Sequence, residues 1–213
     1  MTDDGTGDPR AQSSAPIIFG AGGHARVIAS LLGDDVMFVV RAPEAPDQIS
    51  QDAFFASVDE WRDRDVYLGI GDNAIRDELW NDLQAVGITP TTIVSPRATV
   101  DRTARLGAGV MLSHGAVVCA NAVIEDNVIV NTMASVDHDC RVGQGTHLTT
   151  AVHLGGGVRL GAMNFLGMGV IVTPGVTLGD ATTVMAGAVV VRDFDGHGVL
   201  GGSPARPLRQ DGA

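Results

Sequence analysis

The chain has 213 residues, is 45% hydrophobic but only 4% aromatic, and carries a formal net charge of −11. Such an acidic chain is a poor partner for nucleic acid or for an anionic membrane surface. All 14 basic residues are arginine, and without lysine the chain can form neither a Walker-type phosphate loop nor a lysine Schiff base.

Residues 1–15 are small, polar and acidic, and we predict that they form a disordered tail rather than a signal peptide. No apolar run in the sequence is long enough to cross a bilayer. The two cysteines, Cys119 and Cys140, do not make a disulfide framework, and Cys140 falls at a position expected to face inward. We therefore expect a cytoplasmic protein with no membrane partner.

Residues 16–90 alternate short apolar runs with stretches of helical pattern. This alternation predicts a small α/β, Rossmann-like domain with a parallel sheet. The apolar runs at 17–19 and 66–70 each lead into a loop that contains glycine, at 20–24 and 69–73.

The first loop runs from a strand through glycines into the start of a helix. Such a loop lets backbone N–H groups approach an anion, and a helix N-terminus favours negative charge. We predict a phosphate-binding role for Gly20, Gly22, Gly23 and His24, with a simple tight turn as the alternative.

The second loop contains Gly71, Asp72 and Asn73 and follows the strand predicted at 66–70. The carboxyl ends of parallel strands meet at one edge of a sheet, so the two loops are expected to share one ligand crevice. The alternative is that Asp72 or Asn73 only caps the helix that follows.

The second half of the chain has a repeat of six residues. Between residues 94 and 190 every sixth residue is Val, Leu or Ile without a miss: Val94, Val100, Leu106, Leu112, Val118, Ile124, Val130, Val136, Val142, Leu148, Leu154, Leu160, Leu166, Val172, Leu178, Val184 and Val190. No helical period is compatible with six, and the Gly, Asp and Asn between these positions suit corners. The repeat predicts a parallel β-helix over residues 91–197, followed by a tail at 198–213.

Four motifs, taken together with the hexads, resemble the hexapeptide-repeat acetyltransferases of the sialic-acid O-acetyltransferase (NeuD) type. They are GAGGHARVI at 20–28, GIGDNAIR at 69–76, NTMASVDHDCRVGQGTH at 131–147 and GSPAR at 202–206. Within this group the chain is most similar to bacterial nucleotide-amino-sugar N-acetyltransferases of the bacillosamine or perosamine type. The resemblance implies a left-handed β-helix, a homotrimer, acetyl-CoA bound between neighbouring β-helices, and a role in lipopolysaccharide or O-antigen synthesis.

Acetyl transfer to an amine or hydroxyl needs a base that takes the proton of the nucleophile. With no lysine and no suitable cysteine, histidine is the natural base near neutral pH. His138 lies between Asp137 and Asp139, where a carboxylate can orient the imidazole. His138 also matches the catalytic histidine of the family, and Asp139 matches the acidic residue that orients it.

The resemblance assigns further site residues. His147 matches a histidine beside the acetyl group, with a solvated corner as the alternative, and Asn131 matches an active-site asparagine, although asparagine is also common at corners. Gly156 lies three hexads after His138, so it is expected to stack above it and offer its N–H to the thioester, unless it only turns a corner. Arg206 matches the segment that lines the adenosine end of the coenzyme and is a candidate phosphate partner.

We therefore expect an N-acetyltransferase that uses acetyl-CoA, without a metal, on a nucleotide-linked 4-amino-4,6-dideoxy sugar. A sialic-acid-type sugar O-acetyltransferase is one alternative. The others are a non-catalytic β-helix binding module and a zinc protein like the γ-class carbonic anhydrases, although these use an H-x4-H pair whereas five residues separate His147 from His153.

The nucleotide is expected to differ from UDP. Family members that act on UDP-sugars carry a carboxylate pair just after the second strand, where this chain has Val39, Val40, Arg41 and Ala42. We therefore expect UDP-sugars to be poorer substrates than GDP- or dTDP-sugars.

Overall fold

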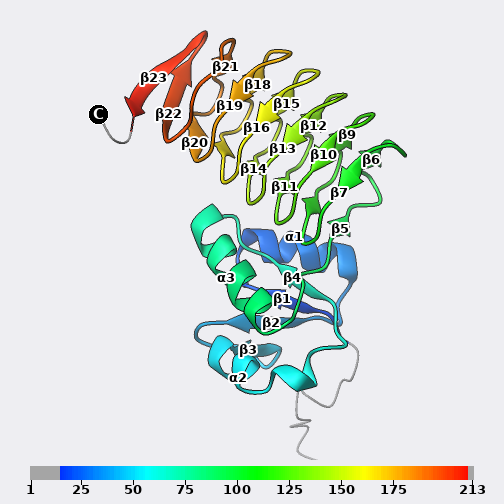
Figure 1. Ribbon diagram of the computed structural model, residues 1–213. Coiled ribbons are helices and arrows are strands. Elements are labelled where there is room, and N and C mark those ends of the chain that lie inside the picture. The colour runs from blue at the N-terminus through cyan, green and yellow to red at the C-terminus, as the bar shows by residue number, and fades with distance from the viewer. Residues whose placement is uncertain (1–14, 211–213) are drawn as a thin grey trace, which may run out of the picture.

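The chain folds into a small α/β unit followed by a prism of stacked coils (Figure 1). The computed structural model describes residues 15–210, with side chains as far as Leu208. The predicted tail therefore lies outside the described residues, except for Ala15, which is buried. No helix within the described range combines the length and the apolar character needed to cross a bilayer.

The α/β unit is built on a parallel sheet with strand order β3-β2-β1-β4. Its elements are β1 (Ile17–Phe19), α1 (Gly23–Leu32), β2 (Met37–Val40), β3 (Gln48–Ser50), α2 (Gln51–Ala56), the 3₁₀ helix η2 (Val58–Glu60), β4 (Val66–Leu68) and α3 (Asn73–Ala85). Successive strand residues face opposite sides. Phe19 packs against Phe54 and Leu83 on the side of α2 and α3, whereas Ile18 packs against Ile28 of α1.

Helix α1 lies between the small sheet and the prism (Figure 1). Its residues Ala25 and Ile28 belong to the same apolar cluster as Met111 and Ile129, which lie on the outer surface of the coils. Burial of this shared apolar surface joins the two units. The glycine loop at the start of α1 is thereby held at their junction.

The prism has coils of eighteen residues. Met111 pairs in parallel with Ile129, and Ile129 pairs with His147. The strands are β5 (Ile93–Val94), β6 (Thr99–Val100), β7 (Arg105–Leu106), β8 (Met111–Leu112), β9 (Val117–Val118), β10 (Val123–Ile124), β11 (Ile129–Val130), β12 (Ser135–Val136), β13 (Arg141–Val142), β14 (His147–Leu148), β15 (His153–Leu154), β16 (Arg159–Leu160), β17 (Phe165–Leu166), β18 (Ile171–Val172), β19 (Thr177–Leu178), β20 (Thr182–Val184) and β21 (Val189–Val190). Every third strand belongs to the same face, which gives three sheets.

The predicted inward positions form the core of the prism. From Leu112 to Val190 every hexad residue is at most 3% exposed. The first three depart from the prediction: Val94 is 42% exposed, and Val100 and Leu106 are only partly buried. They lie in the first coil, where no earlier coil covers them, so burial is incomplete at this end of the stack.

The corners repeat with the same period. A left-handed backbone conformation recurs at every sixth residue from Gly109 to Gly187. Half of these corners are glycine, and the others are Asn121, Asn127, Met133, Asp139, Ala151, Met163 and Ala181. The predicted fold, a left-handed parallel β-helix preceded by a small α/β unit, is confirmed.

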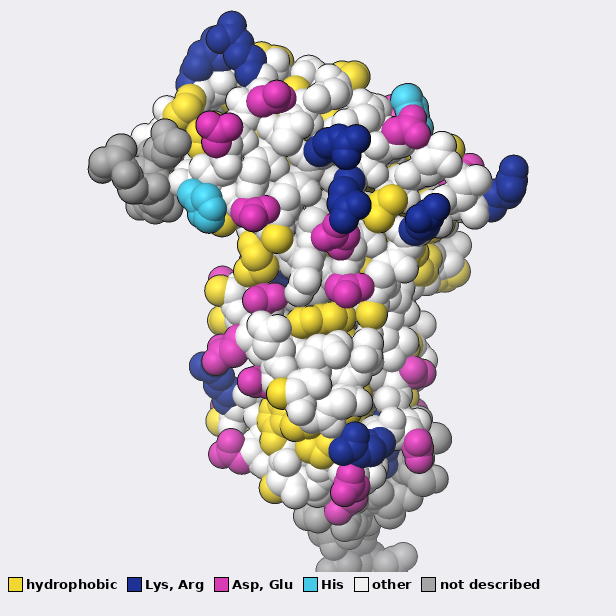
Figure 2. Space-filling model, viewed as in Figure 1, with side chains coloured by type: hydrophobic (Ala, Val, Ile, Leu, Met, Phe, Trp, Pro, Cys, Tyr) yellow, Lys and Arg dark blue, Asp and Glu magenta, His cyan; other side chains and the backbone are white. Residues whose placement is uncertain are grey.

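The last two strands close the far end of one face. Strand β22 (Gly198–Gly202) continues the sheet beside β20, and β23 (Ala205–Gln210) returns antiparallel to it. On the face shown in Figure 2, acidic and arginine side chains are interspersed rather than gathered by sign.

Candidate functional site

The strongest candidate for a base lies at a corner between two faces of the β-helix. The Nδ1 atom of His138 is 2.8 Å from Oδ2 of Asp139, and both side chains are more than half exposed. Asp139 adopts the left-handed conformation of the corner, which carries its carboxylate back toward the imidazole. From the preceding coil, Asn121 donates a hydrogen bond of 3.2 Å to Oδ1 of Asp139.

The two carboxylates beside His138 act differently. Asp139 accepts from the imidazole, whereas Oδ1 of Asp137 accepts from the backbone N–H of His138 at 2.7 Å. The hydrogen bond that the imidazole donates to Asp139, together with the charge of Asp137, raises the pKa of His138. The same hydrogen bond lowers the pKa of Asp139. With Nδ1 held by Asp139, the lone pair of neutral His138 is on Nε2, where it is free to accept a proton.

Gly156 lies directly above this imidazole, as the eighteen-residue coil predicts. A β-carbon built on Gly156 would come within 2.7 Å of Cε1 and Nε2 of His138, so only glycine fits without displacing the ring. Gly156 and Gly157 together form the turn at this corner, and Gly157 adopts its left-handed conformation, with a φ of 71°. The missing β-carbon at Gly156 makes room for the imidazole, and contact of its N–H with the thioester stays a prediction.

A groove of 490 Å³ runs along the outer surface beside His138. Its lining includes Cys119, Ser135, Asp137, His153, Gly155 and Ile171. Within it Oγ of Ser135 is 2.8 Å from Nδ1 of His153. Burial, followed by the charge of Asp137, raises the pKa of the Cys119 thiol, so this cysteine is a poor nucleophile.

A second cluster of predicted site residues forms where the two units meet. His147 is only 3% exposed, so the alternative of a solvated corner is wrong. Its Nδ1 donates to the carbonyl of Gly71 at 3.0 Å, and the amide nitrogen of Asn131 lies 3.3 Å from its Nε2. Burial, then the charge of Arg76, lowers the pKa of His147 to about 3, so the ring is neutral. Because both ring nitrogens already have partners, contact with an acetyl group stays a prediction.

His24 reaches the same cluster from the first turn of α1. Its ring lies edge-on to that of His147 with centroids 5.2 Å apart, and its Nε2 is 3.5 Å from the amide nitrogen of Asn131. Burial lowers its pKa, and the charge of Arg76 adds to this effect. The structure thus brings together His24, Gly71, Asn131 and His147, which the sequence analysis selected separately.

The two glycine loops lie against each other, as expected for a shared crevice. A β-carbon on Gly20 would be 3.1 Å from the carbonyl oxygen of Gly69, and one on Gly69 would be 2.6 Å from Cα of Ala25. These close approaches require glycine. By contrast, nothing in the described chain lies within 4 Å of the β-carbon positions of Gly22 and Gly23, which face open space.

The polar residues of the second loop have structural roles. Asp72 caps α3 by accepting from the N–H of Ile75 at 3.0 Å, which is the predicted alternative. Asn73 directs its side chain to the β-helix, where its amide donates to the carbonyls of Met163 and Asn164. Contact of either residue with a substrate would therefore involve the main chain, and it stays a prediction.

Arg76 is a buried charged residue of this region that is not among the predicted site residues. It lies on α3, is 1% exposed, and reaches both the 69–73 loop and the β-helix. The one sequence feature that points to a role for Arg76 is its place at the end of the GIGDNAIR motif at 69–76. A helix residue of this type is usually solvent-exposed, so burial could not be expected.

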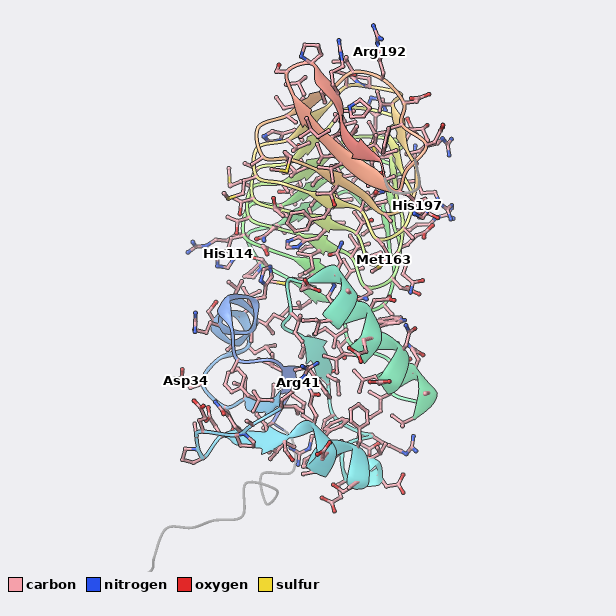
Figure 3. All side chains as sticks on the ribbon, turned by 90° about the vertical axis from the view of Figure 1, so that its left-hand side faces the viewer. Asp34, Arg41, His114, Met163, Arg192 and His197 are labelled. Atoms are coloured by element: carbon pink, nitrogen blue, oxygen red, sulfur yellow. The ribbon has the colours of Figure 1, made fainter. Side chains whose placement is uncertain are left out.

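The remaining predicted residues lie apart from these clusters. Arg206 is exposed on β23 and donates to the carbonyl of Ala205. His114, on the coils nearest the α/β unit, contacts Oγ of Ser95, whereas His197 lies toward the opposite end (Figure 3). His147 and His153 are on different faces, and within residues 15–208 no three His, Cys, Asp or Glu side chains converge as metal ligands do.

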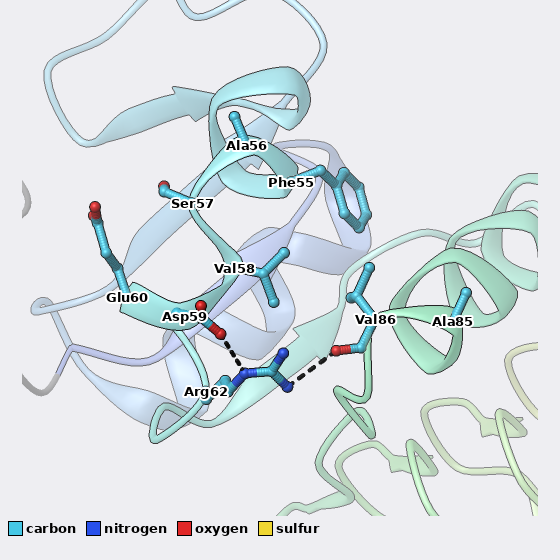
Figure 4. Close-up of a pocket in the computed structure, with 9 residues that line it drawn as sticks. All are labelled: Phe55, Ala56, Ser57, Val58, Asp59, Glu60, Arg62, Ala85 and Val86. Carbon is cyan, nitrogen blue, oxygen red and sulfur yellow. Dashed lines mark hydrogen bonds and ion pairs between the residues drawn. The ribbon is translucent and has the colours of Figure 1, made fainter.

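A further hollow, of 580 Å³, lies between α2, η2 and the end of α3 (Figure 4). Arg62 crosses it, contacting Oδ1 of Asp59 and donating to the carbonyl of Val86. It contains none of the predicted site residues.

Comparison with family models and with curated sequences does not identify the family of this chain. No protein-family model matches the chain. A Schizosaccharomyces pombe protein described as an acetyltransferase is 50% identical over 46 residues, and this match spans only 22% of either chain.

Solved structures match nearly the whole chain. The GDP-perosamine N-acetyltransferase of Caulobacter crescentus, solved as a histidine-to-alanine variant with CoA and GDP-perosamine, is 36% identical; the match covers 91% of this chain and 96% of that one, with a TM-score of 0.85. The acetyltransferase domain of PglB from Neisseria gonorrhoeae, solved with acetyl coenzyme A, is 31% identical; the match covers 92% and 99%, with a TM-score of 0.84. WeeI from Acinetobacter baumannii, at 17% identity and a TM-score of 0.62, is similar in fold.

Proposed function

The chain belongs to the hexapeptide-repeat acetyltransferases of nucleotide-linked amino sugars and is an acetyl-CoA-dependent enzyme, and from this premise we propose that it N-acetylates a nucleotide-linked 4-amino-4,6-dideoxy sugar. The observation that carries the proposal is the pairing of His138 with Asp139 beneath Gly156. It supplies an oriented imidazole with one free nitrogen at the edge of an open groove.

The proposed reaction is direct transfer. The neutral amine of the sugar attacks the thioester carbonyl, a C–N bond forms, and Nε2 of His138 takes the amine proton as the tetrahedral intermediate develops. Collapse of the intermediate breaks the C–S bond and releases CoA as its thiol, to which the imidazolium can return the proton. Asp139 stabilises the imidazolium. The N–H of Gly156, which no β-carbon screens, is the proposed donor to the thioester oxygen.

The acceptor is proposed to bind at the junction. Its phosphates lie at the start of α1, near Gly20, Gly22, Gly23 and His24, and beside the loop with Gly71. The open space at Gly22 and Gly23 supports this placement. Asn131 belongs to the same cluster and is proposed to contact the sugar.

The nucleotide is proposed to be GDP, with dTDP second. The Caulobacter crescentus neighbour binds GDP-perosamine. Arg41 follows β2 here, within the α/β unit (Figure 3), where UDP-specific members of the family carry carboxylates.

The coenzyme is proposed to lie along the groove beside His138, with Arg206 on its phosphates and His147 near its acetyl end. A trimer, a cytoplasmic location and a role in surface-glycan synthesis belong to the same proposal. In a trimer the exposed groove would be closed by a neighbouring β-helix.

A panel of GDP-, dTDP-, CMP- and UDP-linked 4-amino-4,6-dideoxy sugars tests the proposal, with acetyl-CoA as donor. Thiol release and the product mass are measured, and we expect N-acetylation to be fastest with the GDP-sugar. A preferred UDP-sugar would overturn the nucleotide but keep the reaction. O-acetylation of free sialic acid, with no turnover of any nucleotide amino-sugar, would overturn the reaction.

A further inference from the structure

Arg76 is a cation buried among neutral oxygens. Its guanidinium donates to the carbonyls of Ile70, Gly71, Asn127 and Gly145 and to the side-chain oxygens of Asn73 and Asn127. In the described chain no carboxylate is hydrogen-bonded to it. Burial lowers the pKa of Arg76 to about 10, so it remains charged at neutral pH. The charges of Asp77 and Asp72 act in the opposite direction, but neither carboxylate is hydrogen-bonded to the guanidinium. A buried charge that no carboxylate contacts directly is costly, and it calls for an explanation beyond packing.

The guanidinium orients two successive peptide units of the second loop. Nη1 lies 3.2 Å from the carbonyl oxygen of Ile70 and 3.3 Å from that of Gly71. In a trans peptide the N–H points opposite to the C=O. The amides of Gly71 and Asp72 therefore point away from Arg76, and neither donates a recorded hydrogen bond within the described residues. Two aligned free amides of this kind form a site for an anion.

These amides lie next to the start of α1. A β-carbon on Gly71 would meet the ring of His24, so the loop rests directly on the first turn of that helix. Nδ1 of His147 also donates to the carbonyl of Gly71, at 3.0 Å, and this second hydrogen bond strengthens the orientation. Asn127 and Gly145, one coil apart on the β-helix, fix the other side of the guanidinium.

We propose that Arg76 is the positioning residue of the acceptor's diphosphate site. It holds the amides of Gly71 and Asp72 toward the phosphates and places a positive charge beneath the two peptide dipoles. The diphosphate adds negative charge to that of Asp72 and Asp77, neither of which is hydrogen-bonded to the guanidinium. This inference rests on the proposed function, because the acceptor there is nucleotide-linked.

One pair of variants isolates a single amide. Asp72 has a φ of −71°, which proline can adopt, so Asp72→Pro removes the N–H with little backbone strain. Asp72→Ala is the matched control, because it loses the same helix cap but keeps the amide. We expect the acceptor KM of Asp72→Pro to exceed that of Asp72→Ala by on the order of tenfold, with kcat and acetyl-CoA KM alike in both variants.

A second set of variants addresses the charge. Arg76→Met should raise the acceptor KM by about 10- to 100-fold, and Arg76→Lys should restore part of the affinity, because lysine keeps the charge but not the planar set of donors. Arg62→Met is the control for the loss of one arginine, because Arg62 lies in the separate hollow of the α/β unit. Its acceptor KM should be that of the unaltered enzyme.

Calorimetric titration with GDP alone separates the inference from the proposed function. We expect GDP to bind the unaltered enzyme and to bind Asp72→Pro more weakly than Asp72→Ala, whether or not a sugar substrate is found. Equal GDP affinity and equal acceptor KM in the Asp72 pair would overturn the inference, and so would failure of both GDP and dTDP to bind. Should Arg76→Met not fold, the Asp72 pair still decides. Absence of turnover with every nucleotide amino-sugar would instead reject the proposed function.

Discussion

The imidazole of His138 lies against the α-carbon of Gly156, one coil later in the β-helix, so closely that a β-carbon there would come within 2.7 Å of Nε2. The nitrogen that faces Gly156 is the one that Asp139 leaves free. This contact between two coils ties the base to the glycine proposed to bind the thioester.

Gly156→Ala should therefore lower kcat/KM by about 10²-fold, because the methyl group displaces the imidazole and small displacements of a catalytic group are costly. We expect the melting temperature of Gly156→Ala to be nearly unchanged, because the exposed His138 side chain can rotate away while the β-helix stays folded. Steady-state kinetics check this. Activity within twofold of the unaltered enzyme would mean that the ring need not occupy its observed position.

His138→Ala should lower kcat by about 10²–10⁴-fold with little change in the KM for acetyl-CoA. Asp139→Asn should cost less, because the imidazole remains, and its pH–rate profile should move to lower pH, since loss of the carboxylate lowers the pKa of His138. His197→Asn, at the far end of the prism, is the control. Near-normal turnover by a folded His138→Ala variant would reject the base. Greater damage from Asp137→Asn would mean that the other carboxylate orients it.

His147 should make stability depend on pH. Its pKa is about 3 in the folded chain and 6.5 as the ordinary value, so between these pH values the unfolded chain binds a proton that the folded chain excludes. The free energy of unfolding should fall as the pH falls through this window, by about 1.4 kcal/mol per pH unit from this residue. Urea denaturation at pH 6 and at pH 4.5 measures the loss of unfolding free energy between these pH values. This loss should be smaller in His147→Gln than in the unaltered protein. Identical losses of unfolding free energy in the two proteins would contradict the lowered pKa of His147 and would mean that its imidazole is more hydrated.

Arg206→Ala should raise the KM for acetyl-CoA and leave kcat largely intact, because a phosphate contact is common to ground and transition states. Arg192→Ala, at the far end of the prism (Figure 3), is the matched control for charge. Initial-rate kinetics with varied acetyl-CoA give the answer. An unchanged KM would remove Arg206 from the coenzyme site.

Sedimentation equilibrium should give a mass three times the 22.0 kDa of one chain. The groove beside His138 is open in a single chain, and a second β-helix is needed to form a cleft around the coenzyme. A monomer with full activity would refute both the trimer and the shared cleft.

The sequence predicted the register of the β-helix well because one period sets every inward residue. Once Leu112 is inward, Val130 and Leu148 must be as well, and Gly156 must stack on His138. In this part of the chain, the eighteen-residue coil alone therefore determines which residues stack on one another. The exposure of Val94 is an end effect that the repeat does not reveal.

The junction could not be predicted in the same way. The partners of Arg76 include Asn127 and Gly145, both more than 50 residues away and on the other unit. Gly145 contributes only its backbone carbonyl, and Asn127 contributes its carbonyl and its side-chain oxygen. Every residue has a carbonyl, and asparagine is common at β-helix corners, so neither residue type marks the contact. The sequence therefore showed which loops carry glycine but not which cation lies behind them.

The recurrence of the left-handed corner at every sixth residue from Gly109 to Gly187 constrains how this chain can change in length. Inserting one residue inside a coil would shift all later residues by one place and turn the aliphatic row outward, unless the extra residue leaves the coil as a loop. Removing eighteen residues, by contrast, deletes one complete coil and joins two coils whose strands lie on the same faces. Homologues of different length should therefore differ by whole coils or by loops at the corners. A shortened enzyme that keeps the coils of His138 and Gly156 is a realistic engineering target.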